Sequence, residues 1–173
     1  MKQIYLAGPD VFLADAAAHF NRLCARCAEF GLRGVQPSDG GIGSGAHDAA
    51  LARRILDANL ALIAACDGLL ANLQPFRNPL EPDSGTVFEL GYAVALGKPV
   101  AGWLPAPHRA YEARVAEHCG CMLDAAGRTL DAAHGYLVES FGQPLNLMLA
   151  CSTPLHPSVD AALADLAGRL AVR

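Results

Sequence analysis

The feature that most constrains the fold is the alternation of short apolar runs with longer segments of helical periodicity. The runs have the length of buried strands, and apolar residues in the segments between them recur every three to four positions. In chain order, runs and segments occupy residues 3–7, 15–30, 32–35, 47–65, 68–73, 86–96 and 99–103. Because parallel strands need a crossover connection, this order predicts an α/β fold with a mostly parallel sheet and helices on both faces.

The rest of the chain is less regular. A helix is predicted over residues 158–171 with Ser158 as its N-cap, and residues 144–151 look partly helical. Residues 105–129 are expected to form a loop with a short helix near 111–117, and residues 130–140 fit either a helix or a short strand. Without repeats or a linker composition, the sequence predicts one domain spanning residues 1–173.

Composition excludes several classes of protein. Hydrophobic residues make up 53% of the chain and charged residues 17%, which argues against disorder. The net charge of -4 argues against a nucleic-acid-binding surface, which needs clustered Lys and Arg. No stretch has the length of a membrane span, and the N-terminal run is too short for a signal peptide. We therefore expect a cytoplasmic protein with no membrane or nucleic-acid partner and with reduced thiols.

The six cysteines raise the question of a metal site. Cys24 and Cys27 have the spacing of a redox or zinc pair, but they lie within a helical pattern and lack a matching second pair. His118, Cys119 and Cys121 lack a fourth ligand at the usual spacing. Buried or structural thiols are the favoured interpretation, and we expect no metal and no organic cofactor.

Two carboxylates stand where chemistry is expected. Glu89 interrupts a run that is otherwise apolar from Val87 to Trp103 except for Lys98, and Asp83 precedes it by six residues, behind a Ser-Gly hinge. Charged side chains are rarely buried without a partner or a function. In an open parallel sheet, ligands bind beyond the carboxyl ends of the strands, where residues 7–12, residues 74–83 and the start of the next helix should meet.

Each candidate residue also has a purely structural interpretation. Thr86 and Glu89 fit a capping box, and Asp83 fits a turn. Tyr5 on the first strand could simply be part of the core. The remaining candidates are two asparagines in apolar segments that need hydrogen-bond partners, an arginine that could be solvated, and a glycine-rich loop that fits a mobile lid better than a phosphate loop: Asn59, Asn146, Arg77 and residues 40–45.

Taken together, several segments resemble the nucleoside 2-deoxyribosyltransferase family. The resemblance covers most of the chain and is weakest over residues 105–129. It is carried by Ile4-Tyr-Leu-Ala-Gly-Pro9, Asp67-Gly-Leu-Leu-Ala-Asn72, Asp83-Ser-Gly-Thr-Val-Phe-Glu89-Leu-Gly-Tyr-Ala93, Gly97-Lys-Pro-Val100 and Pro144-Leu-Asn-Leu-Met148.

The resemblance implies a flavodoxin-like fold with a five-stranded sheet, a homodimer or an assembly of dimers, and a role in nucleotide salvage. It implies cleavage of the N-glycosidic bond of a 2′-deoxynucleoside and transfer of the sugar to a free nucleobase. Glu89 matches the nucleophile, Asp83 an acidic residue near the base, and Tyr5 the tyrosine that holds the nucleophile. Asn146 matches an asparagine that the neighbouring subunit lends to the sugar. The expected substrate-binding residues are Gly8, Asn59, Arg77, Ser84, Gly85, Asn146 and Met148.

Two features of the sequence bear on the alternatives. Several family members carry Asp where this chain has Asn59, which can donate a hydrogen bond but cannot act as an acid. A related group hydrolyses deoxynucleoside 5′-monophosphates and has serines where this chain has Asp83 and Asn146. A carboxylate at position 83 would repel a 5′-phosphate by up to about 4 kcal/mol at 4 Å. The sequence therefore favours a transferase over an N-glycohydrolase, with a non-catalytic nucleotide-binding module as a third alternative.

Overall fold

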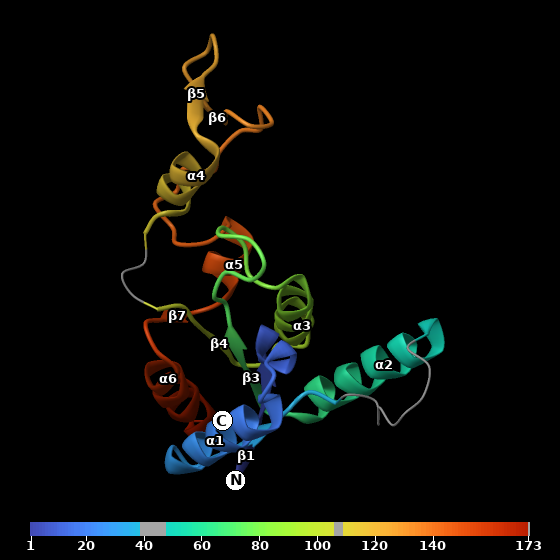
Figure 1. Cartoon of the computed structure of the whole chain (residues 1–173). Coiled ribbons are helices and arrows are strands. Elements are labelled where there is room, and N and C mark those ends of the chain that lie inside the picture. The colour runs from blue at the N-terminus through green and yellow to red at the C-terminus, as the bar shows by residue number, and fades with distance from the viewer. Residues whose placement is uncertain (39–47, 106–108, 173) are drawn as a thin grey trace.

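A parallel five-stranded sheet forms the centre of the computed structural model, which describes residues 1–38, 48–105 and 109–172 (Figure 1). The strand order is β2-β1-β3-β4-β7, and every neighbouring pair is parallel. The strands are β1 (Lys2–Ala7), β2 (Leu32–Val35), β3 (Gly68–Asn72), β4 (Val100–Trp103) and β7 (Leu155–His156). The predicted α/β class and parallel sheet are confirmed, and β7 is a strand that the sequence pattern did not indicate.

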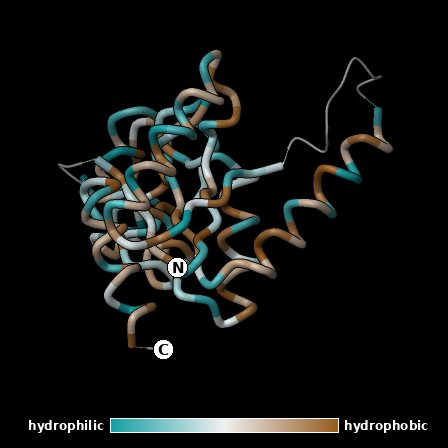
Figure 2. Tube along the Cα trace, turned by 90° about the horizontal axis from the view of Figure 1, so that it is seen from below, coloured by the Kyte–Doolittle hydropathy of each residue, from teal (hydrophilic) through white to brown (hydrophobic). Residues whose placement is uncertain are grey.

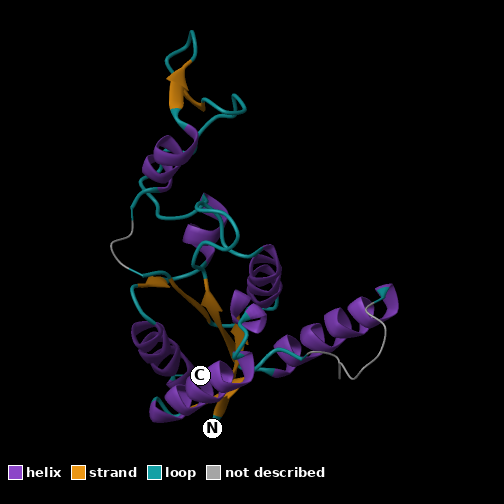
Figure 3. Cartoon of the chain, in the orientation of Figure 1, coloured by secondary structure: helices purple, strands orange, loops and turns teal. Residues whose placement is uncertain are grey.

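Helices cover both faces of this sheet, as Figure 3 shows by the position of the purple helices around the orange strands. One face packs against α1 (Ala16–Glu29) and α6 (Val159–Ala171). The other packs against α3 (Ser84–Ala95), a short helix α5 (Leu147–Ser152) and the C-terminal end of α2 (Ala49–Ala65). The rest of α2 projects from the body, with hydrophobic and hydrophilic residues alternating along it (Figure 2).

Side chains of β1, which lies between β2 and β3, alternate between these two cores. Ile4 and Leu6 pack on the α1 and α6 side, whereas Tyr5 and Ala7 pack on the α3 side. This is the period of two that a strand imposes, and all four side chains are buried. The alternation therefore directs the Tyr5 hydroxyl toward α3, the helix that carries Glu89.

Residues 111–131 form an arm that stands away from the sheet (Figure 1). It contains α4 (Tyr111–Cys119) and an antiparallel pair of strands, β5 (Cys121–Leu123) and β6 (Thr129–Asp131). The predicted short helix at 111–117 is confirmed, but part of the predicted loop is strand β5. Residues 130–140 begin as strand, because Leu130 and Asp131 belong to β6 and Leu130 also bridges to Leu137.

The predicted N-cap of the C-terminal helix is confirmed. Ser158 caps α6 by accepting a hydrogen bond from the Ala161 N–H at 3.2 Å. Asp15 occupies the N-cap position of α1, but its carboxylate makes no capping bond and instead pairs with Arg22 at 3.1 Å. The predicted lid at residues 40–45 lies outside the described residues. None of the described helices combines the length and apolarity needed to cross a bilayer.

Candidate active site

The strand order places the topological switch point of the sheet between β1 and β3. From β1 the chain continues outward to β2 on one side, whereas β3 and β4 lie on the other side, so the direction of winding reverses between β1 and β3. In doubly wound sheets, ligands bind at this switch point, beyond the carboxyl ends of the strands. Here it is framed by the segment after β1, which contains the one-turn helix η1 (Pro9–Phe12), and by the segment from β3 to α3.

Asp83 starts helix α3. Its Oδ2 atom accepts hydrogen bonds from the Thr86 N–H at 2.8 Å and from the Thr86 hydroxyl at 2.9 Å. The helix therefore begins at Ser84, two residues earlier than predicted. Glu89 then lies in the second turn, too far along for its side chain to bond back to the cap, so the capping-box interpretation of Glu89 is wrong. Among the described residues, Oδ1 of Asp83 has no hydrogen-bond partner, which leaves it available to a ligand.

Glu89 is hydrogen-bonded to a side chain of strand β1. The Tyr5 hydroxyl donates a hydrogen bond of 2.6 Å to Glu89 Oε1. The side chain of Tyr5 is fully buried, so its position is fixed by the packing of β1. Tyr5 is thus a core residue whose one polar atom donates to the Glu89 carboxylate, and its catalytic role stays a prediction. Oε2 of Glu89 has no partner among the described residues.

The environment of Glu89 disfavours its charge. Burial, together with a smaller contribution from the negative charge of Asp83, raises the pKa of Glu89 to about 7, and the Tyr5 hydrogen bond opposes that rise. Burial and the adjacent carboxylate also raise the pKa of Tyr5 well above its ordinary range, so Tyr5 remains a neutral donor. A carboxylate whose pKa lies near neutrality is typical of catalytic sites.

Replacing Tyr5 with phenylalanine should move the pH profile of any reaction that needs ionised Glu89. Without the hydrogen bond that favours the charged form, the pKa of Glu89 rises further above about 7. The acid limb of the profile should therefore shift to higher pH, with activity reduced at pH 7 and partly regained near pH 9. Initial rates from pH 5 to 10 measure this, and an unshifted acid limb would show that Tyr5 does not act on Glu89.

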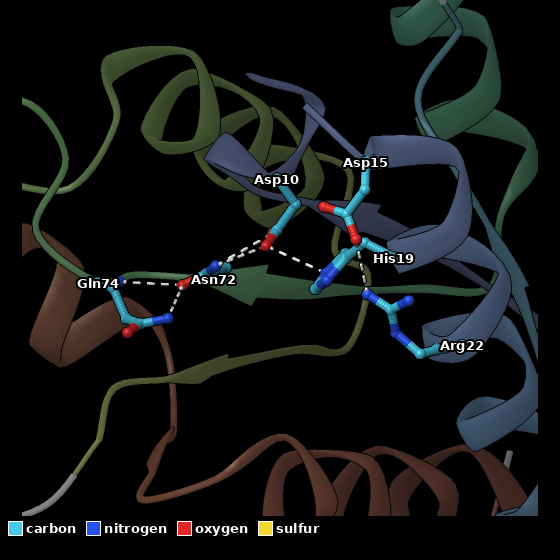
Figure 4. A network of polar contacts seen from close by, with 6 residues as sticks. All are labelled: Asp10, Asp15, His19, Arg22, Asn72 and Gln74. Carbon is cyan, nitrogen blue, oxygen red and sulfur yellow. Dashed lines mark hydrogen bonds and ion pairs between the residues drawn. The ribbon is translucent and has the colours of Figure 1, made fainter. Parts of the chain in front are cut away.

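Close packing at the end of β1 explains Gly8. Its backbone is extended, and a Cβ atom there would collide with the Asp10 carboxylate and lie 2.9 Å from Asn72 Cβ. Asn72 Nδ2 donates to both Asp10 oxygens at 3.1 and 3.0 Å, and the Asn72 Oδ1 atom accepts two bonds of 3.2 Å from Gln74 (Figure 4). The network thus ties together the two segments that frame the switch point.

Asn72 and Asp10 were not among the sequence candidates. The signal that could have found Asn72 is an amide directly after a buried apolar run, since a buried polar group requires partners. The Asp10 carboxylate also contacts His19, whose Nε2 atom lies 3.2 Å from Asp10 Oδ1. These residues position the loops, whereas Gly8 provides the space in which they meet.

Of the other predicted site residues, three lie at or before the start of α3 and one lies on α2. Ser84 and Gly85 form the exposed first turn of α3, beside Asp83, and a Cβ on Gly85 would lie 3.1 Å from Asp83 Oδ2. Arg77 is exposed in the loop before α3. Asn59 lies on α2. Its Oδ1 atom accepts from the Ser38 N–H at 2.7 Å, and its Nδ2 atom donates to the Ser38 carbonyl at 3.1 Å. The structure thus gives Asn59 an anchoring role.

Asn146 and Met148 lie at the start of α5. The Asn146 side chain caps this helix by accepting from the Met148 N–H at 2.9 Å, and its Nδ2 donates to Glu139 Oε1 at 2.7 Å. Glu139 Oε2 in turn accepts from the Leu147 N–H at 3.0 Å, so Glu139 fixes both the helix end and the amide. Met148 is 70% exposed. Within the described ranges, no cluster of three or more His, Cys, Asp or Glu side chains could hold a metal ion.

Comparison with known proteins decides the family. The family model described as nucleoside 2-deoxyribosyltransferase matches residues 4–148, which is most of the chain and includes Tyr5, Asp83, Glu89 and Asn146. The chain belongs to the nucleoside 2-deoxyribosyltransferase family. The family resemblance and the fold expected from the sequence are both confirmed.

Individual proteins resemble the chain over nearly its whole length. A 2-deoxyribosyltransferase from Leishmania mexicana has a similar structure, with a TM-score of 0.67, 33% identity, and coverage of 97% of this chain and 98% of that one. An uncharacterized protein of Schizosaccharomyces pombe is 32% identical over 96% of this chain and 89% of its own. A conserved protein from Enterococcus faecalis shares the fold, with a TM-score of 0.62 and 19% identity over 98% and 99% of the chains.

Proposed function

We propose that the protein transfers 2-deoxyribose from a 2′-deoxynucleoside to a free nucleobase through a covalent deoxyribosyl ester on Glu89. The observation that carries this proposal is the 2.6 Å bond from the buried Tyr5 hydroxyl to Glu89 Oε1, beside the switch point of the sheet. It orients a single carboxylate and leaves the second oxygen unoccupied. Membership of the family and the full-length likeness to the Leishmania mexicana enzyme support the same reaction.

The proposed reaction is a double displacement with retention. Glu89 Oε2 attacks C1′ of the sugar, the C1′–N bond breaks, and the departing nitrogen takes the bonding electron pair and a proton from Asp83. A second base then attacks C1′ from the vacated side, its proton passes to Asp83, and the ester bond to Glu89 breaks. Water in place of the second base gives hydrolysis. Every proton and electron pair is thereby accounted for without a cofactor.

Incubation of the protein with deoxyinosine, with and without adenine, tests the reaction. We expect deoxyadenosine and hypoxanthine in equal amounts when adenine is present, and slow release of hypoxanthine when it is absent. Mass spectrometry of the quenched protein should find a deoxyribosyl group on the peptide that contains Glu89. Base release at a rate insensitive to adenine would instead identify an N-glycohydrolase, and tight nucleoside binding without turnover would identify a binding module.

We further propose that the protein is a homodimer or an assembly of dimers in which Asn146 serves the site of the second copy. Several large apolar side chains near α5 and on the arm are exposed, including Met148 at 70%, Phe141 at 64%, Tyr136 at 72% and Leu123 at 70%. Contiguous exposed apolar surface is typical of protein interfaces. A second copy would cover these side chains and bring Asn146 of one subunit against Glu89 of the other.

Mixing two inactive variants should restore activity if subunits share sites. In a dimer of Glu89→Gln with Asn146→Ala, one site combines an intact Glu89 with an intact Asn146 from the other chain. Random exchange in an equal mixture should then give about a quarter of the wild-type rate. The transfer assay after co-refolding measures this. Sedimentation of the wild type as a monomer, or a mixed population without activity, would contradict the shared site.

A further inference from the structure

Three side chains in the segments after β1 and β3 form one cluster, and the proposed reaction assigns no specific role to any of them. Phe12 ends the segment after β1, and Phe76 and Arg77 lie in the segment after β3, so the set spans both loops that frame the switch point. The two phenyl rings stack, with centroids 5.3 Å apart and planes inclined by 15°. Phe12 is nonetheless 57% exposed, so much of its ring surface is accessible.

Arg77 covers both rings. Its guanidinium carbon lies 4.9 Å from the centroid of Phe12 and 4.5 Å from that of Phe76. Rings 5.3 Å apart leave no space for a guanidinium between them, so the cation lies over the pair from one side. Among the described residues, the guanidinium has neither a carboxylate partner nor a hydrogen-bond acceptor. Its N–H groups therefore have hydrogen-bonding capacity available for a ligand.

The backbone at Arg77 is held in an uncommon conformation. Its φ of 59° lies in the left-handed region, which in the described part of the chain is otherwise occupied only by glycines. Such a conformation costs roughly 1 kcal/mol or more and persists when the surroundings determine it. In this loop, Pro75 bridges to Pro82, the Phe76 N–H bonds to the Glu81 carbonyl at 3.0 Å, and Asn78 Oδ1 accepts two further N–H groups.

The same loop fixes Arg77 relative to the catalytic candidates. Asp83 follows Pro82 directly, so Phe76, Arg77 and the helix cap are parts of one small hairpin-like loop, on which Phe12 stacks from η1. The Tyr111 hydroxyl also donates to Glu81 at 2.6 Å, which ties the loop to α4. Arg77 and Asp83 therefore belong to one tied segment that ends at the start of α3.

We propose that Arg77 is a specificity-determining residue that selects 6-oxopurines, such as hypoxanthine and guanine, over adenine. This inference rests on the proposed transferase function. The exposed phenyl ring provides a face on which a flat base can stack, and the fork of the guanidinium matches two adjacent acceptors, which 6-oxopurines present as O6 and N7. Adenine presents an amino donor in place of O6, so one N–H of the fork would lose its acceptor.

A competition assay separates this role from general substrate binding. Hypoxanthine and adenine compete for the sugar of a single donor, deoxyguanosine, so that the donor step is common to both acceptors. Wild type should favour hypoxanthine, and Arg77→Gln should reduce that preference about ten- to a hundredfold. Arg77→Lys should reduce it similarly, because an ammonium is a point charge without a fork. Arg128→Gln on the arm removes another exposed arginine and should change nothing.

Several results would overturn the assignment. One is an unchanged hypoxanthine preference in an Arg77→Gln protein that melts at the wild-type temperature. Another is a selective loss of activity on deoxyinosine 5′-monophosphate relative to deoxyinosine, which would show that the cation binds a phosphate. If wild type transfers no sugar, the proposed function itself fails. Equilibrium dialysis of free hypoxanthine and adenine against wild type and Arg77→Gln then still tests the recognition by Arg77.

Discussion

Glu89→Gln should lower the rate of deoxyribosyl transfer by at least about a thousandfold, which is the scale on which catalytic nucleophiles act. Glutamine has the same shape and can still accept the Tyr5 hydrogen bond, but its amide cannot form the sugar ester. The measurement is the single-turnover rate with deoxyinosine and adenine at pH 8. A variant that keeps more than a few per cent of the wild-type rate would exclude Glu89 as the nucleophile.

The control for this variant is its thermal stability, which should change with pH in a defined direction. Because the pKa of Glu89 is raised to about 7, the wild type loses stability as pH rises from about 4.5 through 7 and the buried carboxyl ionises. Glutamine cannot ionise, so at pH 8 the variant should be more stable by up to about 3 kcal/mol, or several degrees in melting temperature. At pH 4 the two proteins should melt alike. An equal difference at both pH values would contradict the raised pKa.

Asp83→Asn should separate the chemistry of Asp83 from its structural role. Asparagine is as good an N-cap as aspartate, so its side-chain oxygen should still accept from Thr86 and α3 should still begin at Ser84. What is lost is the ability to give and take a proton, and transfer should fall about a hundred- to ten-thousandfold. The measurement is the rate of transfer from deoxyinosine to adenine, with circular dichroism to verify folding.

The choice of leaving group sharpens the Asp83 experiment. A nucleoside whose base departs as a stabilised anion needs little proton donation, so the loss in Asp83→Asn should be much smaller for such a substrate. Asp83→Ala serves as the matched variant, since it removes the cap as well and should cost about 1 kcal/mol of stability in addition. Equal losses for good and poor leaving groups would indicate that Asp83 does not transfer the proton.

The regular part of this fold could be predicted because its signals are local. Periodicity of two or of 3.6, bounded by Gly and Pro, is enough to find β1 to β4 and the helices between them. β7 could not be found in this way, because it has two residues, Leu155 and His156, and exists only because β4 offers it a partner. The β5 and β6 hairpin has no alternating pattern either, since all three residues of β5 are apolar and all three are exposed.

The site residues, too, could be predicted only where their signal in the sequence is local. The Asp83 and Glu89 motif was visible because an acidic residue in an apolar helix is unusual, but the motif could not show which residue caps the helix. That depends on the backbone, which turns at Asp83 rather than at Thr86. Asp10 and Asn72 were not visible, because their bond joins residues far apart in the chain. The catalytic and binding roles of the predicted residues remain predictions that the experiments above test.

The phenol that restrains Glu89 lies on the buried part of β1, so the rate of the reaction should respond to small changes in the packing of the interior. Truncation of the Leu69 or Ile63 side chain, neither of which contacts a ligand in our proposal, would let the middle of the sheet relax by tenths of an ångström. The attacking oxygen of Glu89 would then be less precisely oriented. Turnover should then decline before the protein measurably unfolds. In laboratory evolution, variants that repair such hidden packing defects would be recovered as gains in activity.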